Sequence, residues 1–253
     1  MSSTANAFKA AKVPAVTFGF WVLKVLATTL GETGGDALSM SWQLGYLVST
    51  CIFALLFFAT VGFQVRASKF HPSVYWLTII TTTTVGTTLA DFVTRSIGIG
   101  YLGGSLLLLT LLIASLFIWK STTGSISISS ISDTRSELFY WITIMFSQTL
   151  GTAVGDWTAD TLDCGYLGSV GLFGGLLLLI AFMYWKSWLP STPLFWLAFI
   201  LTRPFGAVLG DFLDKTHEQG GLSLSRFAAS GVILALMVVF GLLFPQKAAT
   251  RSH

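Results

Sequence analysis

Apolar residues fill eight segments of this chain, each about 20 residues long and separated by short polar breaks. The segments are 15–36, 44–63, 73–91, 99–119, 138–157, 164–185, 192–212 and 222–244. A helix needs about 20 mostly apolar residues to cross the hydrocarbon core of a bilayer. The breaks contain turn-forming pairs such as His71-Pro72 and Pro190-Ser191. The pattern predicts an all-α membrane protein with eight transmembrane helices in one integral membrane domain, residues 1–253.

The composition agrees with this pattern. Hydrophobic residues make up 53% of the 253 residues and charged residues only 10%, whereas soluble domains carry about 25% charged residues. The composition excludes an ordinary cytosolic enzyme, a disordered chain and a nucleic-acid binder. The two cysteines, Cys51 and Cys164, exclude a disulfide framework and a Cys-rich metal cluster.

The distribution of Lys and Arg predicts the orientation. The side that holds both termini would carry nine of them: Lys9, Lys12, Arg66, Lys69, Lys120, Arg135, Lys186, Lys247 and Arg251. The opposite side would carry three, Arg95, Lys215 and Arg226. Cytoplasmic loops are enriched in Lys and Arg, so both termini are predicted to be cytoplasmic. The lipid bilayer is an expected partner, and a homo-oligomer is compatible with the sequence.

One motif recurs four times in a fixed register. Each copy starts with an aromatic-Trp pair: Phe20-Trp21, Tyr75-Trp76, Tyr140-Trp141 and Phe195-Trp196. Ten residues after each Trp stands a glycine: Gly31, Gly86, Gly151 and Gly206. A small residue and an Asp follow together: Gly35-Asp36, Ala90-Asp91, Gly155-Asp156 and Gly210-Asp211. We expect the Trp rings to anchor the helices at the headgroup interface.

The motif divides the chain into four two-helix units, 15–63, 73–119, 138–185 and 192–244. The Ser/Thr-rich segment 120–137 is expected to be a flexible linker between two halves. Because each unit contains two spans, all four units point the same way, as parallel repeats about an axis near the membrane normal. The prediction is a pseudo-fourfold or two-by-two arrangement.

The odd-numbered spans each present a polar stripe that ends in the Asp. Positions seven, eleven and fifteen residues after the Trp share one helix face. The first set is Thr28, Thr83, Gln148 and Arg203, and the second is Glu32, Thr87, Thr152 and Ala207. The even-numbered spans lack such residues and are assigned to the outer, lipid-facing wall. Small residues four apart let helix backbones approach closely, so helix packing is the role expected for Gly31, Gly35, Gly86, Gly151, Gly155, Gly206 and Gly210.

The ionisable residues within the spans are the candidate functional residues. Five acids, Glu32 and the four Asp, face two bases, Lys24 and Arg203, so the local charge is about −3 if all are ionised. Intramembrane carboxylates are expensive unless they bind something or are partly hydrated. An oxygen-rich acidic cluster suits a hard cation or protons. The alternative is that each Asp ends its helix near water. Lys24 and Arg203 would balance charge or act as gates.

No enzyme signature is present. The sequence has no His-x-x-x-His pair, phosphate-binding loop or nucleophile motif in a suitable context, so neither a catalytic residue nor a cofactor is predicted.

The four tandem units, each with a Trp and a Gly-x-x-x-(Gly/Ala)-Asp stretch, resemble a bacterial inner-membrane protein family built from a repeat of unknown function. The resemblance covers residues 17–240 and implies a bacterial inner-membrane location and an eight-span fold. The stretch Glu32-Thr33-Gly34-Gly35-Asp36 is also similar in its chemistry to the Glu-x-Gly-Asp-(Lys/Arg) motif of manganese and calcium exchangers. It has one extra residue and no base after Asp36, and those exchangers have inverted repeats.

The resulting hypothesis is a transporter of a hard divalent cation, with manganese the first candidate and proton coupling compatible with it. Asp36, Asp91, Asp156, Asp211 and Glu32 would be the metal ligands, and Thr28, Thr83, Thr87, Gln148 and Thr152 the polar lining. Two other classes stay open. One is a proton-coupled exporter of a small organic molecule, and the other is a non-transporting structural membrane protein.

Overall fold

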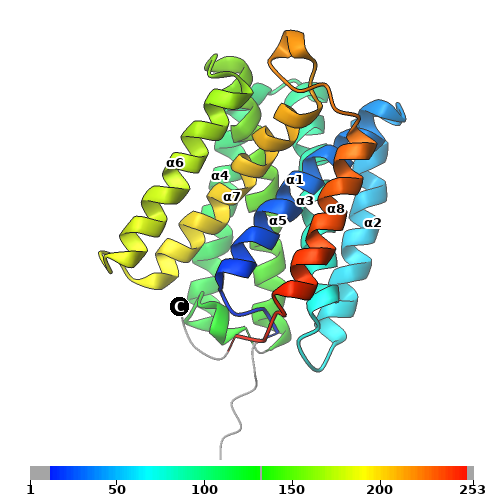
Figure 1. Cartoon of the computed structure of the whole chain (residues 1–253). Helices are drawn as coiled ribbons and strands as arrows, with labels where there is room; N and C mark the ends of the chain where they lie inside the picture. The colour runs from blue at the N-terminus through cyan, green and yellow to red at the C-terminus, as the bar shows by residue number, and fades with distance from the viewer. Residues whose placement is uncertain (1–11, 132, 250–253) are drawn as a thin grey trace, which may run out of the picture.

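The computed structural model describes residues 12–131 and 133–249, which form eight α-helices (Figure 1). The helices are α1 Phe18–Asp36, α2 Gly45–Arg66, α3 Pro72–Asp91, α4 Gly100–Thr123, α5 Thr134–Asp156, α6 Gly165–Trp185, α7 Ser191–Asp214 and α8 Arg226–Leu243. The all-α prediction is confirmed for this part of the chain. Five helices, α2, α4, α6, α7 and α8, are long and apolar enough to cross a membrane. Helices α1, α3 and α5 are more polar because Thr and ionisable residues line one face of each.

Four helices form an inner ring. Helix α1 packs against α3, α3 against α5, α5 against α7, and α7 returns to α1. The even-numbered helices cover this ring from outside: α2 packs on α3, α4 on α5, α6 on α7, and α8 on α1. Each outer helix therefore packs mainly on the inner helix of the next repeat. The last repeat closes the ring by covering the first.

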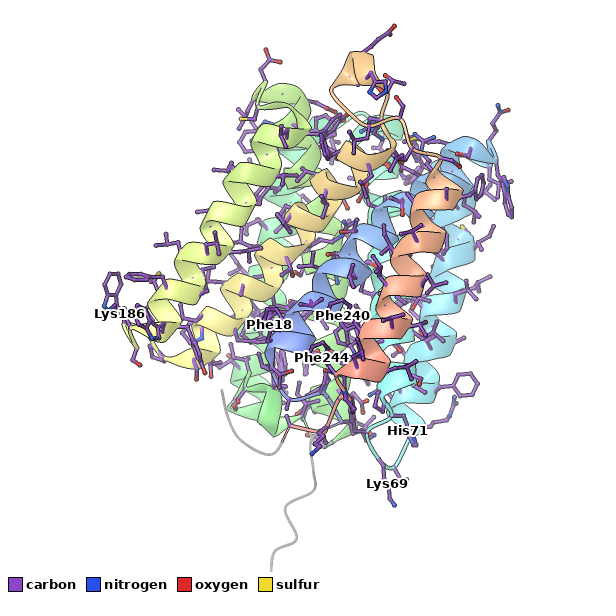
Figure 2. The ribbon with its side chains drawn as sticks, viewed as in Figure 1. Phe18, Lys69, His71, Lys186, Phe240 and Phe244 are labelled. Atoms are coloured by element: carbon purple, nitrogen blue, oxygen red, sulfur yellow. The ribbon has the colours of Figure 1, made fainter. Side chains whose placement is uncertain are left out.

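The outer helices turn large apolar side chains away from the ring. Leu55, Phe63, Phe117, Leu178 and Leu242 are each at least 70% exposed. Side chains project from α6 and α8 along their whole length in Figure 2. This apolar wall agrees with the outer position predicted for the even-numbered spans.

Small residues at the helix contacts allow the inner helices to approach one another closely. A Cβ on Gly31 would overlap Thr83 of the next inner helix, and a Cβ on Gly206 would overlap Thr28 of the first. The other predicted packing glycines lie at equivalent contacts: Gly35 against Thr87, Gly86 against Gln148, Gly151 against Arg203, Gly155 against Ala207, and Gly210 against Glu32. In each pair the glycine belongs to one repeat and its neighbour to the next, with the fourth repeat followed by the first.

An aromatic layer closes the ring at the end where the helices of the ring begin. Phe20, Tyr75, Tyr140 and Phe195 are all buried there, and the hydroxyl groups of Tyr75 and Tyr140 lie 2.6 Å apart in a hydrogen bond. The neighbouring tryptophans are buried as well, with Trp76, Trp141 and Trp196 at most 8% exposed. The prediction that these rings anchor at the headgroup interface is wrong for these three, because they pack into the aromatic core.

Both described ends of the chain meet beneath this layer. The backbone N–H of Ala249 donates to the carbonyl of Val13 at 2.9 Å, and the backbone N–H of Ala15 donates to the carbonyl of Lys247 at 2.8 Å. Figure 2 shows Lys69 and His71 at this lower end of the molecule and Lys186 at the left, beyond the end of α6. Lys9 and Arg251, which entered the predicted orientation, lie outside the described residues.

The segment between α4 and α5 is a packed connector, so the prediction of a flexible linker over 120–137 is wrong for its described part. Helix α4 continues to Thr123 and α5 already begins at Thr134. Between them Ile128 and Ile131 are buried in the core. The indole N–H of Trp196 donates to the carbonyl of Ile126 at 3.1 Å. Isoleucines spaced among the serines supply the apolar contacts that fix the segment.

The glycine contacts predict a sharp position dependence of stability. We expect Gly206→Ala to lower the free energy of unfolding by about 1–3 kcal/mol, because the added methyl group overlaps Thr28 of a helix that cannot withdraw. Thermal unfolding in detergent micelles measures this. Gly231→Ala in α8 is the matched control, since a Cβ there has no neighbour within 4 Å. Equal melting temperatures for the two variants would contradict close packing at the α7–α1 contact.

Candidate functional site

The interior of the ring is organised in layers, each with one residue from every inner helix. The lysine layer contains Lys24, Ile79, Ile144 and Phe199, and the arginine layer contains Thr28, Thr83, Gln148 and Arg203. The glutamate layer contains Glu32, Thr87, Thr152 and Ala207, and the aspartate layer contains Asp36, Asp91, Asp156 and Asp211. All sixteen side chains belong to buried residues. The layers follow one another in that order, starting next to the aromatic layer.

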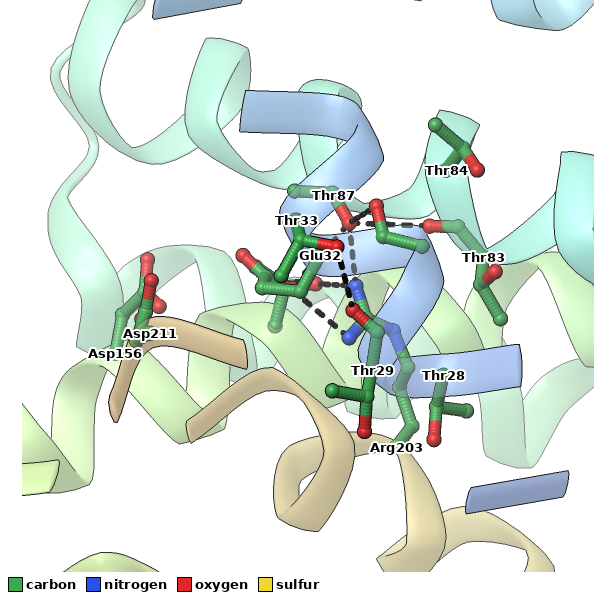
Figure 3. Close-up of polar contacts among 12 residues, drawn as sticks. Thr28, Thr29, Glu32, Thr33, Thr83, Thr84, Thr87, Asp156, Arg203 and Asp211 are labelled. Carbon is green, nitrogen blue, oxygen red and sulfur yellow. Dashed lines mark hydrogen bonds and ion pairs between the residues drawn. The ribbon is translucent and has the colours of Figure 1, made fainter. Parts of the chain in front are cut away.

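Arg203 binds all three other inner helices at once. Its Nη1 donates to Glu32 Oε2 on α1 at 2.9 Å, and its Nη2 donates to Thr87 Oγ1 on α3 at 2.6 Å and to Thr152 Oγ1 on α5. Figure 3 shows the guanidinium group of Arg203 beside Glu32 and Thr87. Because the three partners come from three sides, the guanidinium group lies at the centre of the ring. It is fully buried.

The sequence makes room for this arginine in two places. Its own helix carries Ala207 in the glutamate layer, where the other three helices carry oxygen-bearing side chains. Across the α5–α7 contact stands Gly151, and any Cβ there would overlap the Arg203 stem. The threonine hydroxyl groups of the lining serve mainly as helix contacts. Thr28 donates to the carbonyl of Thr202 at 3.1 Å, and Thr83 donates to that of Ala27 at 3.2 Å.

The four aspartates form two pairs, each bridged by a base. Lys215 Nζ lies 2.9 Å from both Asp36 Oδ2 and Asp211 Oδ1. Arg95 Nε lies 2.8 Å from Asp91 Oδ1, and Arg95 Nη2 lies 3.1 Å from Asp156 Oδ2. Each base stands four residues after one Asp and reaches the Asp of the following repeat. We call these groups the Lys215 triad and the Arg95 triad.

The regular α-helix ends at three of the four aspartates, whereas α7 continues past Asp211 to Asp214. Asp36, Asp91 and Asp156 are each followed by a π-helical turn, Ala37–Ser41, Phe92–Ser96 and Trp157–Thr161. Such turns are uncommon and frequently occur at functional sites. Arg95 is about one-third exposed, so this end of the ring opens toward the surface, whereas the aromatic end is closed.

The bases of the triads correct the predicted charge. Arg95 and Lys215 were assigned to loops on the outer side, but they reach into the acidic cluster. Five acids now face four bases, so the local charge is about −1 and not −3 if all are ionised. Both bases were recognisable as i,i+4 partners of an Asp. A further pair, Arg226 Nε with Asp214 Oδ2 at 2.8 Å, borders the Lys215 triad.

Three of the five predicted metal ligands come together. Glu32, Asp36 and Asp211 each offer a carboxylate oxygen, and these three oxygens lie within 4.8 Å of one another. Asp36 Oδ1 is buried and has no hydrogen-bond partner in the part of the chain that the structure describes. Asp91 and Asp156 instead belong to the Arg95 triad. Carboxylate oxygens at this spacing are suitable ligands for a hard divalent cation.

Two other predicted site residues, Lys24 and Gln148, lack hydrogen-bond partners for their side chains among the described residues. Lys24 Nζ is buried, has no hydrogen-bond acceptor, and lies 4.2 Å from the centroid of the Phe199 ring. The expectation that Lys24 neutralises a carboxylate is therefore wrong for the described residues, among which Arg203 is the base paired with Glu32. The side-chain amide of Gln148 is likewise buried and unpartnered.

Comparison with known proteins identifies the repeat. A family model described as Repeat of Unknown Function (DUF347) matches four stretches, residues 19–70, 74–125, 139–187 and 194–247. These stretches correspond to the four two-helix units. No curated protein matches the chain, and no solved structure matches it.

The Arg203–Glu32 pair predicts a strong energetic coupling. Removing one member of a buried ion pair costs about 3–5 kcal/mol, because the other charge stays buried without a counter-charge. We therefore expect Arg203→Met or Glu32→Gln alone to destabilise the protein strongly, and the double variant to recover most of the loss. The free energies of unfolding of wild type, the two single variants and the double variant, measured in detergent, together give the coupling free energy between the two residues. Glu218→Gln, at an exposed position, is the control and should change stability by less than about 0.5 kcal/mol. Additive effects of the two core substitutions would refute the coupling.

Proposed function

This chain belongs to the DUF347 repeat family, and we propose that it is an integral inner-membrane transporter of a hard divalent cation. In this proposal all eight helices span the bilayer, with pseudo-fourfold order of the inner ring and both termini in the cytoplasm. The polar faces of α1, α3 and α5 are turned inward, and the outer helices supply the apolar surface that lipid requires. Lys and Arg residues are more numerous at the end of the molecule that holds both termini, which supports a cytoplasmic position of that end.

The cation would bind to Glu32, Asp36 and Asp211. The observation that carries this proposal is the convergence of these three buried carboxylates, one of which retains an unpartnered oxygen. Manganese, magnesium and calcium all prefer oxygen ligands, and Mn²⁺ is the first ion to test.

Lys215 would act as an internal competitor. Its ammonium group bridges Asp36 and Asp211 at 2.9 Å, so it occupies the side of the carboxylates where a metal ion would bind. Lys215 follows the last residue of α7 and begins the connection to α8. An arriving divalent cation would displace the ammonium group, and the release of the cation would let it return.

A non-transporting structural role is the second candidate, and the pairing of nearly all core charges favours it. In that case the triads only fix the register between neighbouring repeats. Measurements of ion transport separate the two candidates, because both predict that loss of a triad lowers stability, and only the first predicts ion movement.

We expect Asp36→Asn to weaken Mn²⁺ binding at least about tenfold, because it removes a charged ligand (a factor of ten corresponds to about 1.4 kcal/mol). Uptake of Mn²⁺ into proteoliposomes and calorimetric titration of the purified protein measure transport and affinity. Asp163→Asn is the matched control, since Asp163 is exposed in the turn before α6, with a φ of 58° that Asn tolerates. Wild-type uptake by Asp36→Asn would end the transport proposal.

Lys215→Gln tests the competitor separately. Removing the ammonium group should tighten Mn²⁺ binding by about tenfold, because the ion no longer has to displace a charge already paired with Asp36 and Asp211. The same titration measures it, with Lys186→Gln at an exposed position as control. Weaker binding in Lys215→Gln would show that the lysine supports the site and does not compete for it.

A further inference from the structure

Lys24 occupies an unusual place in the ring. Its side chain is fully buried, and no hydrogen-bond acceptor among the described residues meets its Nζ. The residues of its layer on the other inner helices are Ile79, Ile144 and Phe199, each also fully buried. Burial without an acceptor disfavours the ammonium form, because the charge loses its hydration, whereas the face of the Phe199 ring, 4.2 Å from Nζ, stabilises it. The amine can therefore hold or lose a proton according to the charge around it.

The ionisable groups around Lys24 come from few elements. On α7, Arg203 stands one turn beyond Phe199, toward the aspartate layer. On α3 and α5 the nearest are Tyr75 and Tyr140, one turn away in the aromatic layer and hydrogen-bonded to each other. Helix α8, which packs on the outside of α1, carries no ionisable residue beyond Arg226 at its start. Within the part of the chain that the structure describes, Lys24 therefore faces one fixed positive charge and no carboxylate of another helix.

Glu32 connects Lys24 to the cation site. It lies eight residues after Lys24 on the same face of α1, about 12 Å along the helix. Its Oε2 accepts a hydrogen bond from Arg203, and the same carboxylate belongs to the group with Asp36 and Asp211. A divalent cation that binds this carboxylate weakens its hold on Arg203. The positive charge of Arg203 is then less compensated on the side that faces Lys24.

We propose that Lys24 is a proton-binding site whose protonation excludes the divalent cation, so that cation binding at Glu32, Asp36 and Asp211 releases one proton from the Lys24 ammonium group. The N–H bond breaks, nitrogen retains the electron pair as a neutral amine, and the proton passes to water. The inference rests on the proposed function and adds the group that links it to protons. At about 12 Å and an effective dielectric constant of about 20, the repulsion between a divalent cation and one positive charge corresponds to about a 100-fold change in affinity.

The test compares Lys24→Met, a permanently neutral side chain, with Lys24→Arg, a permanently charged one. Mn²⁺ is titrated into purified full-length protein by calorimetry between pH 6 and 8, in two buffers that differ in ionisation enthalpy, which gives the protons released per ion. We expect wild type to release about one proton more than Lys24→Met. At every pH, Lys24→Met should bind Mn²⁺ about 100-fold more tightly than Lys24→Arg. Lys186→Met, at an exposed lysine, should behave as wild type.

The outcomes separate this inference from the function on which it rests. If wild type and Lys24→Met bind Mn²⁺ and release equal numbers of protons, the role of Lys24 is refuted and the cation site stands. If wild type binds no divalent cation at any pH, the proposed function fails and this inference fails with it. Thermal unfolding checks the fold, and Lys24→Met should be at least as stable as wild type because an unpartnered buried amine is removed. If Lys24→Met does not fold, Lys24→Gln serves as the neutral variant.

Discussion

The buried guanidinium group of Arg203 is the constraint on which the inner ring depends. A fixed positive charge in an apolar bundle requires acceptors from the protein itself, and here one residue of each other inner helix supplies them: Glu32, Thr87 and Thr152. These side chains are short, so the four helices must approach closely. The glycines at every contact between neighbouring inner helices make that approach possible. The close approach of the four helices, the glycines at their contacts and the polar residues around Arg203 therefore depend on one another.

The four repeats share a backbone plan but differ in chemistry, and the difference has a twofold pattern. A base stands four residues after the Asp in the second and fourth repeats, as Arg95 and Lys215, and in neither of the others. Arg95 presents a planar guanidinium group that holds two carboxylates through separate nitrogens. Lys215 presents a single point charge between two carboxylates. In the proposed function, a metal ion would replace the ammonium group more readily than the guanidinium group, so the Lys215 triad would exchange cations and the Arg95 triad would remain a permanent link between repeats.

The sequence predicted the regular part of this structure and missed the part that depends on long side chains. Repeat register and helix periodicity correctly indicated the eight helices, the inward face of Glu32 and the aspartates, and the close contacts at positions such as Gly206. Periodicity places Cα atoms on a face, but it does not say how far a long side chain reaches. Arg95 and Lys215 were therefore left outside the acidic cluster, although their i,i+4 spacing from an Asp was visible. The tryptophans were misplaced for a related reason, because an aromatic residue near a helix end fits a lipid interface or a core equally well.

Charge balance decides how such a ring could handle a cation. Each carboxylate of the two triads already has an internal base, so a free ion gains little by adding to the cluster and must replace a bound charge. Replacement conserves the local charge only if another positive charge leaves at the same time. Lys215 can withdraw but remains attached to the chain, whereas a proton on Lys24 can leave entirely. In the proposed function, a divalent ion would exchange its two charges for one withdrawn ammonium group and one released proton, because this exchange keeps the local charge constant. The pairing that makes the ring stable at rest would then also make it an obligatory exchanger.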